Sequence, residues 1–143
     1  MMGYLNNPEE TEKALHNGWL LSGDAGYLTD DDYLHVVDRV KDMIISGGEN
    51  VYSVEVEGAI YRHVAVEHCA VVGLPDDKWG ERVHAEVLLK SADSAIKEEL
   101  TDHCREYLAG YKLPRSIQFV EVLPLTAVGK VDKVAIRNKY ADS

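Results

Sequence analysis

The residues whose types and spacing most suggest chemistry lie between Leu123 and Lys133, in the sequence Leu-Pro-Leu-Thr-Ala-Val-Gly-Lys-Val-Asp-Lys. Pro124 fixes one backbone angle and Gly129 permits a tight bend, so Lys130 is expected at the tip of a shaped loop. An ammonium group held in such a place can stabilise negative charge in a transition state. Taken alone, a Gly-Lys pair after a turn is more often an ordinary surface lysine.

Two charged residues earlier in the chain stand out, one for its chemistry and one for its place in the sequence. Asp24 follows a glycine, and its carboxylate can accept two hydrogen bonds, which suits the two hydroxyl groups of a ribose. Arg39 lies in a charged stretch between two apolar runs. Each residue also has a plainer interpretation. Asp24 could be an aspartate in a turn, and Arg39 could form a surface ion pair with Asp38 or Asp42, which stabilises little.

A further group of residues could approach a thin ligand. Gly47 and Gly48 let the backbone come close to another surface, although a tight turn is the simpler interpretation. Trp79 is a large aromatic residue in a predicted exposed loop, Pro75 to Glu81. There it could cover the edge of the core, which is the usual position of a tryptophan in a loop.

The charge of the chain is uneven. The formal net charge is −10, which argues against a general nucleic-acid binder, yet residues 111–143 carry 6 basic and 3 acidic side chains. Lys112 and Arg115 lie in this basic part and could meet phosphates. For Arg137 and Lys139, a basic helix that faces water is an equally simple prediction.

Composition bounds the class of protein. A chain of 143 residues can bury one modest core, and no apolar run approaches the roughly 20 residues of a membrane helix. The first residues show no secretion signal. Cys69 and Cys104 lack metal-ligand or redox spacing, so both are predicted to be buried thiols in a cytoplasmic protein. Asp30 to Asp32 lacks the pattern of a calcium loop, and no metal site is predicted.

Three stretches resemble the motifs of the adenylate-forming enzymes, and they occur in the same order. These enzymes are acyl-CoA and aryl-CoA synthetases, adenylation domains of peptide synthetases, and firefly-type luciferases. The matching stretches are Gly18 to Asp24, Asp38 to Asn50, and Leu123 to Lys133. The Gly-Gly-Glu-Asn sequence at residues 47–50 resembles fatty-acyl and aryl-CoA ligases more than peptide synthetases.

The resemblance implies a role for each candidate residue. Lys130 matches the catalytic lysine, Asp24 and Arg39 match residues that contact the nucleotide, and Lys41 matches the hinge. The implied substrates are ATP with Mg²⁺, which yields AMP, and CoA. The residues expected at the CoA site, from matching positions or from the basic end, are Gly47, Gly48, Trp79, Lys112 and Arg115.

The elements that must position these residues indicate an α+β fold. We expect a helix from Pro8, a hairpin of residues 26–28 and 33–37, and a strand at residues 43–45. Ser53 is predicted to cap the next helix. Strands are predicted at residues 66–73, at residues 82–90 with one buried face, and at residues 116–122. A helix is predicted from Ser94 to Gly110, and Asp132 is predicted to cap the last helix. Together these give a short hairpin near the hinge and a central sheet of about three strands with helices on both faces.

The resemblance also implies a division of the chain. Residues 1–40 resemble the β-rich end of a large N-terminal domain, and residues 41–143 resemble the whole small, rotating C-terminal domain. The phosphate-binding loop and the acyl pocket would lie in the large domain, so the chain alone is expected to be inactive. Residues 1–40 could then form a homodimer. The alternatives are an adenylation-domain fragment that serves a carrier protein, and a non-enzymatic interaction module.

Overall fold

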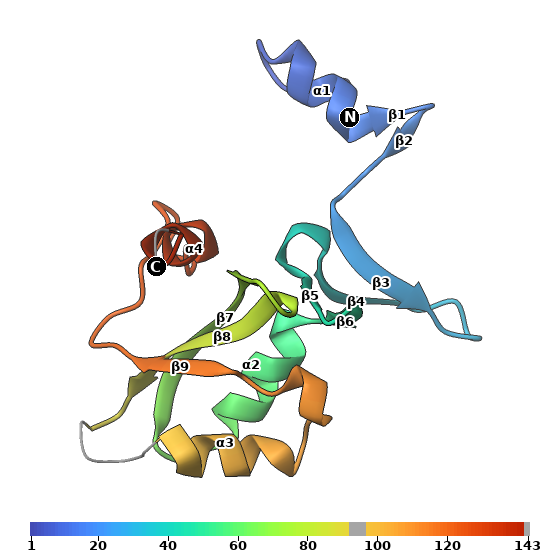
Figure 1. The fold of residues 1–143 in the computed structure, drawn as a ribbon. Coiled ribbons are helices and arrows are strands. Elements are labelled where there is room, and N and C mark those ends of the chain that lie inside the picture. The colour runs from blue at the N-terminus through green and yellow to red at the C-terminus, as the bar shows by residue number, and fades with distance from the viewer. Residues whose placement is uncertain (92–96, 142–143) are drawn as a thin grey trace. The chain divides into compact units, whose positions relative to one another are not determined.

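The computed structural model describes residues 1–91 and 97–141 and forms two compact units, Met1–Lys41 and Asp42–Ser143 (Figure 1). Among these residues no helix combines the length and apolar character needed to cross a membrane.

The first unit is a short helix followed by two hairpins. Helix α1 (Pro8–Ala14) begins with a proline, and the Asn7 side chain accepts a hydrogen bond from the Glu10 amide. Strands β1 (Leu15–His16) and β2 (Trp19–Leu20) form the first hairpin. Strands β3 (Asp24–Leu28) and β4 (Leu34–Arg39) form the second, as predicted. The short helix η1 (Val40–Asp42) follows.

The second unit is built on a five-stranded sheet. Strands β5 (Ile44–Ser46) and β6 (Glu49–Val51) form a hairpin, which meets β8 (Gly80–Leu89) through the pair Ser46 and Gly80. Strand β8 pairs along its length with β7 (Val66–Asp76) and runs parallel to β9 (Ser116–Phe119). The predicted α+β fold is confirmed, and β8 is the central strand, which pairs with β5, β7 and β9.

Helices cover both faces of this sheet. Alternate residues of β7 point to opposite faces: Val71 belongs to the core under α2 (Ser53–Tyr61) and α3 (Lys97–Arg105), and Val72 packs with Ile136 of α4 (Lys133–Lys139). Figure 1 shows α4 on the opposite side of the sheet from α2 and α3. Short helix η2 (Gly110–Lys112) leads into β9.

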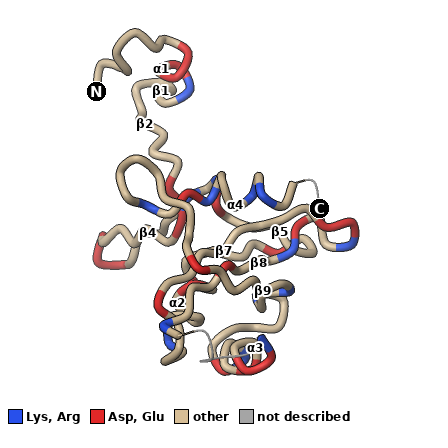
Figure 2. Tube along the Cα trace, turned by 90° about the vertical axis from the view of Figure 1, so that its left-hand side faces the viewer, with Lys and Arg blue, Asp and Glu red and all other residues tan. Residues whose placement is uncertain are grey.

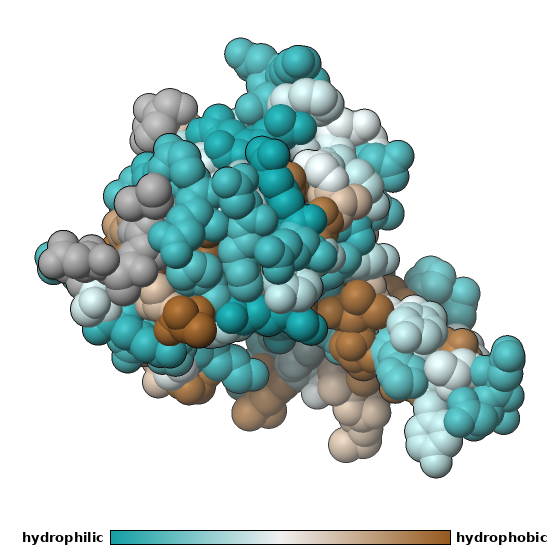
Figure 3. Space-filling model, turned by 90° about the horizontal axis from the view of Figure 1, so that it is seen from below, coloured by the Kyte–Doolittle hydropathy of each residue, from teal (hydrophilic) through white to brown (hydrophobic). Residues whose placement is uncertain are grey.

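The outer side of the second unit near α3 is polar. Helix α3 lies lowest in Figure 1, and the view from below in Figure 3 shows a largely hydrophilic surface there. The exposed residues of α3 include Lys97, Glu98, Asp102 and Arg105, whereas Leu100 and Cys104 face the core. The predicted start of this helix, Ser94, lies outside the described residues.

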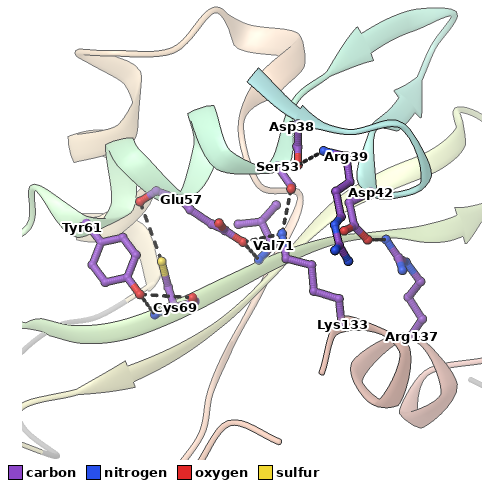
Figure 4. Close-up of polar contacts among 10 residues, drawn as sticks. All are labelled: Asp38, Arg39, Asp42, Ser53, Glu57, Tyr61, Cys69, Val71, Lys133 and Arg137. Atoms are coloured by element: carbon purple, nitrogen blue, oxygen red, sulfur yellow. Dashed lines mark hydrogen bonds and ion pairs between the residues drawn. The ribbon is translucent and has the colours of Figure 1, made fainter. Parts of the chain in front are cut away.

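Strand β7 lies at one edge of the sheet, and side chains of α2 bond its outer backbone groups. The Tyr61 hydroxyl accepts a hydrogen bond from the Cys69 amide (3.2 Å) and donates one to the Cys69 carbonyl (3.4 Å). The Glu57 carboxylate accepts a hydrogen bond from the Val71 amide (2.9 Å; Figure 4). A helix therefore takes the place of a further strand at this edge.

Two predictions about local structure were wrong. Strand β8 is buried on both faces, because α4 covers the face that carries His84 and Glu86. Ser53 is not the N-cap of α2: Tyr52 holds that position, and the Ser53 hydroxyl accepts a hydrogen bond from Lys133. The predicted cap of the last helix is confirmed, since the Asp132 carboxylate accepts from the Ala135 amide.

Candidate functional site

Lys130 lies at the end of a tight turn whose backbone is closed by hydrogen bonds. The Lys130 amide donates to the Thr126 hydroxyl (3.2 Å), and the Thr126 amide donates to the Lys130 carbonyl (2.7 Å). Gly129 has φ +78°, a conformation that glycine adopts without steric cost. Leu125 and Val131 form a β-bridge below the turn. The backbone of Lys130 is thus fixed, while its side chain is exposed to solvent.

Asp24 and Arg39 are brought together in the first unit. They are directly opposite each other in the antiparallel pair of β3 and β4, although they lie fifteen positions apart in the sequence. The Val40 amide donates to the Gly23 carbonyl (2.9 Å) and closes this end of the hairpin. Both side chains are exposed. An exposed carboxylate beside an exposed guanidinium can contact a ribose and a phosphate of one nucleotide.

Gly47, Trp79 and Arg115 also converge, in the second unit. The Gly47 amide donates to the Trp79 carbonyl (2.8 Å), and a Cβ atom on Gly47 would lie 2.9 Å from Cε3 of the Trp79 ring. The guanidinium carbon of Arg115 lies 4.1 Å from the centre of that ring, and the Lys78 ammonium lies 4.7 Å from it. This arrangement combines a flat aromatic surface with two cations.

Lys112 does not join this group but forms an ion pair with helix α2. Its ammonium group lies 2.6 Å and 2.7 Å from the two carboxylate oxygens of Glu55 on α2, and this hydrogen bonding raises the pKa of Lys112. The ion pair holds η2 against the first turn of α2. Lys112, one of the five residues expected at the CoA site, therefore already has a carboxylate partner.

The hinge candidate Lys41 is exposed within η1, next to the buried residue Asp42. Asp42 accepts a hydrogen bond from the Arg137 guanidinium (2.8 Å; Figure 4). The sequence suggested Asp42 as a partner of Arg39, whereas the structure pairs it with a residue of α4.

Sequence reasoning missed the ion pairs of α4. Basic residues recur along this helix (Figure 2), and three of them bind acids from three different elements. Lys133 pairs with Glu57 of α2 (2.8 Å), Arg137 with Asp42 of η1, and Lys139 with Glu86 of β8 (2.7 Å). Arg137 and Lys139 therefore do not belong to a helix face that simply faces water. The signal was Glu86, a carboxylate between the apolar residues Ala85 and Val87.

The region under the end of α4 is polar and buried. Glu86 is 1% exposed and accepts hydrogen bonds from Lys139 and from the Tyr140 hydroxyl (2.8 Å). His84 Nδ1 lies 2.7 Å from the Ser116 hydroxyl, and burial lowers the pKa of His84 to about 4. Within residues 1–91 and 97–141, His84 Nε2 and Glu86 Oε2 are the buried side-chain atoms that have no hydrogen-bond partner.

Known proteins are similar to this chain in sequence and in fold. The family model described as AMP-binding enzyme C-terminal domain matches residues 55–130. A feruloyl-CoA synthase of an Amycolatopsis species is 46% identical over 140 residues, which cover 98% of this chain and 28% of that protein. A long-chain-fatty-acid–CoA ligase of Mycobacterium tuberculosis is 43% identical over 138 residues, 96% of this chain and 27% of that protein.

Solved structures of known proteins also match this chain. The ATP-bound structure of MatB from Rhodopseudomonas palustris matches with a TM-score of 0.89 at 33% identity, over 98% of this chain and 28% of that one. The o-succinylbenzoate-CoA synthetase of Bacillus subtilis, in complex with its acyl-adenylate intermediate, matches with a TM-score of 0.88 at 41% identity, over 100% of this chain and 28% of that one. The chain thus spans little more than a quarter of the length of these relatives.

Proposed function

Because this chain belongs to the AMP-binding enzyme C-terminal domain family, we propose that it is the C-terminal part of an ATP-dependent acyl-CoA synthetase. The reaction would join a carboxylic acid to AMP with release of pyrophosphate, and CoA would then displace AMP to give a thioester. The relatives named feruloyl-CoA synthase and long-chain-fatty-acid–CoA ligase support an aromatic or fatty acid as the substrate.

The observation that carries this proposal is the presentation of Lys130. Its backbone is fixed by the paired hydrogen bonds with Thr126, and its ammonium group is exposed. In the first half-reaction negative charge gathers between the attacking carboxylate, the α-phosphate of MgATP and the leaving pyrophosphate. A positioned cation stabilises that charge, and its removal typically costs about 100- to 1000-fold in rate.

The other candidate residues take the remaining roles. Asp24 would bind the ribose of ATP, and Arg39 would contact its phosphates. The turn at Gly47 and Gly48, with Trp79 and Arg115, would receive CoA in the second half-reaction. We propose that rotation about Lys41 exchanges the Lys130 face for the CoA face between the two steps.

We further propose that residues 1–40 are the last segment of the large domain and that residues 41–143 are the small, rotating domain. Trp19, Leu20, Leu21 and Tyr33 are exposed in the first unit, which fits a segment whose packing partner is the large domain. Without that partner these side chains would support a homodimer. Sedimentation at high micromolar concentration tests this, because a monomer there would rule out the homodimer.

The decisive experiment is a chimera. The chain replaces the matched 140 residues of the Amycolatopsis feruloyl-CoA synthase, and pyrophosphate release and thioester formation are measured with ferulate, ATP, Mg²⁺ and CoA. We expect activity from the chimera, none from the isolated chain, and a loss of about 100- to 1000-fold in the adenylation step with Lys130→Ala.

Other outcomes of this experiment would lead to other functions. A chimera that forms the adenylate but transfers it only to a carrier protein would favour the peptide-synthetase type of activity. A folded chimera in which Lys130→Ala changes nothing would contradict the proposed role and favour an interaction module.

A further inference from the structure

The tip of the Lys130 loop has little to hold it in place. Leu125, Val128, Gly129 and Lys130 are all exposed, so the hydrogen bonds within the turn fix its shape but not its location on the domain. The location depends on the two ends of the loop. Leu123 is buried at the first end; at the other end Val131 packs against the core cluster that contains Leu123 and Ile136, and α4 begins with Lys133.

Lys133 is bound by two residues of α2. Its ammonium group lies 2.7 Å from the Ser53 hydroxyl and 2.8 Å from Oε1 of Glu57 (Figure 4). The side chains of Lys133 and Glu57 are 18% and 17% exposed, and Ser53 is fully buried. The same Glu57 oxygen accepts the hydrogen bond from the Val71 amide of the central sheet. The Glu57 carboxylate thus links the first residue of α4 to both α2 and β7.

The connection from Lys133 back to Lys130 is short and rigid. Asp132 caps α4 through the Ala135 amide, and the Asp132 amide donates to the Pro124 carbonyl (2.8 Å). That bond and the bridge between Leu125 and Val131 tie the two sides of the loop together. A shift at Lys133 is therefore passed to Lys130 three residues away.

We propose that Glu57 and Lys133 are positioning residues for Lys130, and that their ion pair sets where the Lys130 ammonium stands during adenylation. The inference rests on the catalytic role proposed for Lys130. Glu57 and Lys133 would touch neither the nucleotide nor the acid; they would act through the loop.

The first test measures amide hydrogen exchange in the chain itself. With Lys133→Met, the amides of Thr126, Lys130 and Asp132 should exchange roughly 10- to 100-fold faster relative to the amides of β7, the effect expected for losing a hydrogen bond between charged groups. Glu57→Gln should act in the same direction while keeping the oxygen that binds the Val71 amide. Lys133→Arg should restore protection, because it keeps the charge.

The matched control is Lys112→Met. It breaks the ion pair of Lys112 with Glu55, which joins α2 to η2 at 2.6 Å with side chains 19% and 38% exposed. This control should leave the Lys130 loop protected. Unchanged loop exchange in Lys133→Met and Glu57→Gln, equal acceleration in Lys112→Met, or an acceleration shared by β7 would each overturn the proposal.

A second readout uses the chimera and separates the half-reactions. Lys133→Met should slow pyrophosphate release at least tenfold and leave thioester formation from supplied feruloyl adenylate unchanged, whereas a general loss of folded protein would lower both equally. Equal loss in both steps would overturn the positioning role. A failure of the chimera itself would refute the proposed function. The hydrogen-exchange result on the isolated chain would still decide whether the ion pair of Glu57 and Lys133 holds the Lys130 loop in place.

Discussion

The turn between β5 and β6 allows a prediction in which two neighbouring glycines should behave differently. Gly47 and Gly48 have φ values of +64° and +85°, as expected for the central residues of a tight hairpin turn. A Cβ atom on Gly48 would meet no atom within 4 Å, whereas one on Gly47 would lie 2.9 Å from the Trp79 ring. Gly48→Ala is therefore the matched control for Gly47→Ala.

The expected magnitudes follow from these contacts. An alanine with positive φ costs about 1–2 kcal/mol, partly offset by about 0.4–1 kcal/mol because the unfolded chain becomes less flexible. Both variants carry this backbone term. Gly47→Ala must also displace the Trp79 ring, at about 0.5–1.5 kcal/mol for a strained rotamer and about 0.5–1 kcal/mol for weaker contact with Arg115. Gly47→Ala should thus be about 1–2.5 kcal/mol less stable than Gly48→Ala.

The assay is thermal unfolding together with tryptophan fluorescence, in a Trp19→Phe background that leaves Trp79 as the only tryptophan of the sequence. For a unit of this size, a difference of about 1–2.5 kcal/mol corresponds to a Tm lower by roughly 4–20 °C. The Trp79 emission should shift in Gly47→Ala and not in Gly48→Ala. Equal Tm values, or an unchanged Trp79 spectrum in Gly47→Ala, would refute the reasoning.

Two further predictions concern the polar region under α4. Tyr140→Phe removes a hydrogen bond to the buried Glu86 carboxylate and should lower the free energy of unfolding by about 1.5–3 kcal/mol in urea titrations; a loss below 0.5 kcal/mol would contradict the 2.8 Å contact. Because burial lowers the pKa of His84 to about 4, the unfolded chain binds a proton that the folded chain does not, and His84 should remove up to about 3 kcal/mol of stability as the pH falls from 6.5 to 4. Urea titrations at pH 7 and pH 4.5 should show a smaller pH dependence in His84→Gln, and an equal dependence would mean that His84 is protonated in the folded state.

The parts of the fold that depend on local chemistry could be predicted from the sequence. The start of α1 at Pro8 and the cap of α4 by Asp132 are examples, because each is determined by residues within one turn of the chain. The β3–β4 hairpin was predicted in the same way from its turn residues. The motif order also led to the family, which the AMP-binding C-terminal domain match then showed.

The parts that depend on distant partners could not be predicted. Glu86 and Lys139 lie 53 positions apart and Ser53 and Lys133 lie 80 apart, so nothing in the local pattern shows that these polar residues meet. An alternating strand with polar residues on one face looks the same whether water or another helix covers that face. For the same reason Ser53, whose residue type suits an N-cap, was predicted to cap α2, whereas its hydroxyl accepts a hydrogen bond from Lys133 of α4.

The way α2 closes the edge of the sheet also bears on how copies of this protein behave toward each other. A bare outer strand offers a row of amide and carbonyl groups to which a strand of another molecule can add. Here the side chains of Tyr61 and Glu57 already form hydrogen bonds with those groups at Cys69 and Val71. A strand of another molecule would therefore first have to displace helix α2. Glu57 and Tyr61 therefore protect the β7 edge against strand-by-strand aggregation, and substitutions that removed both the Glu57 carboxylate and the Tyr61 hydroxyl would open a template for fibril growth.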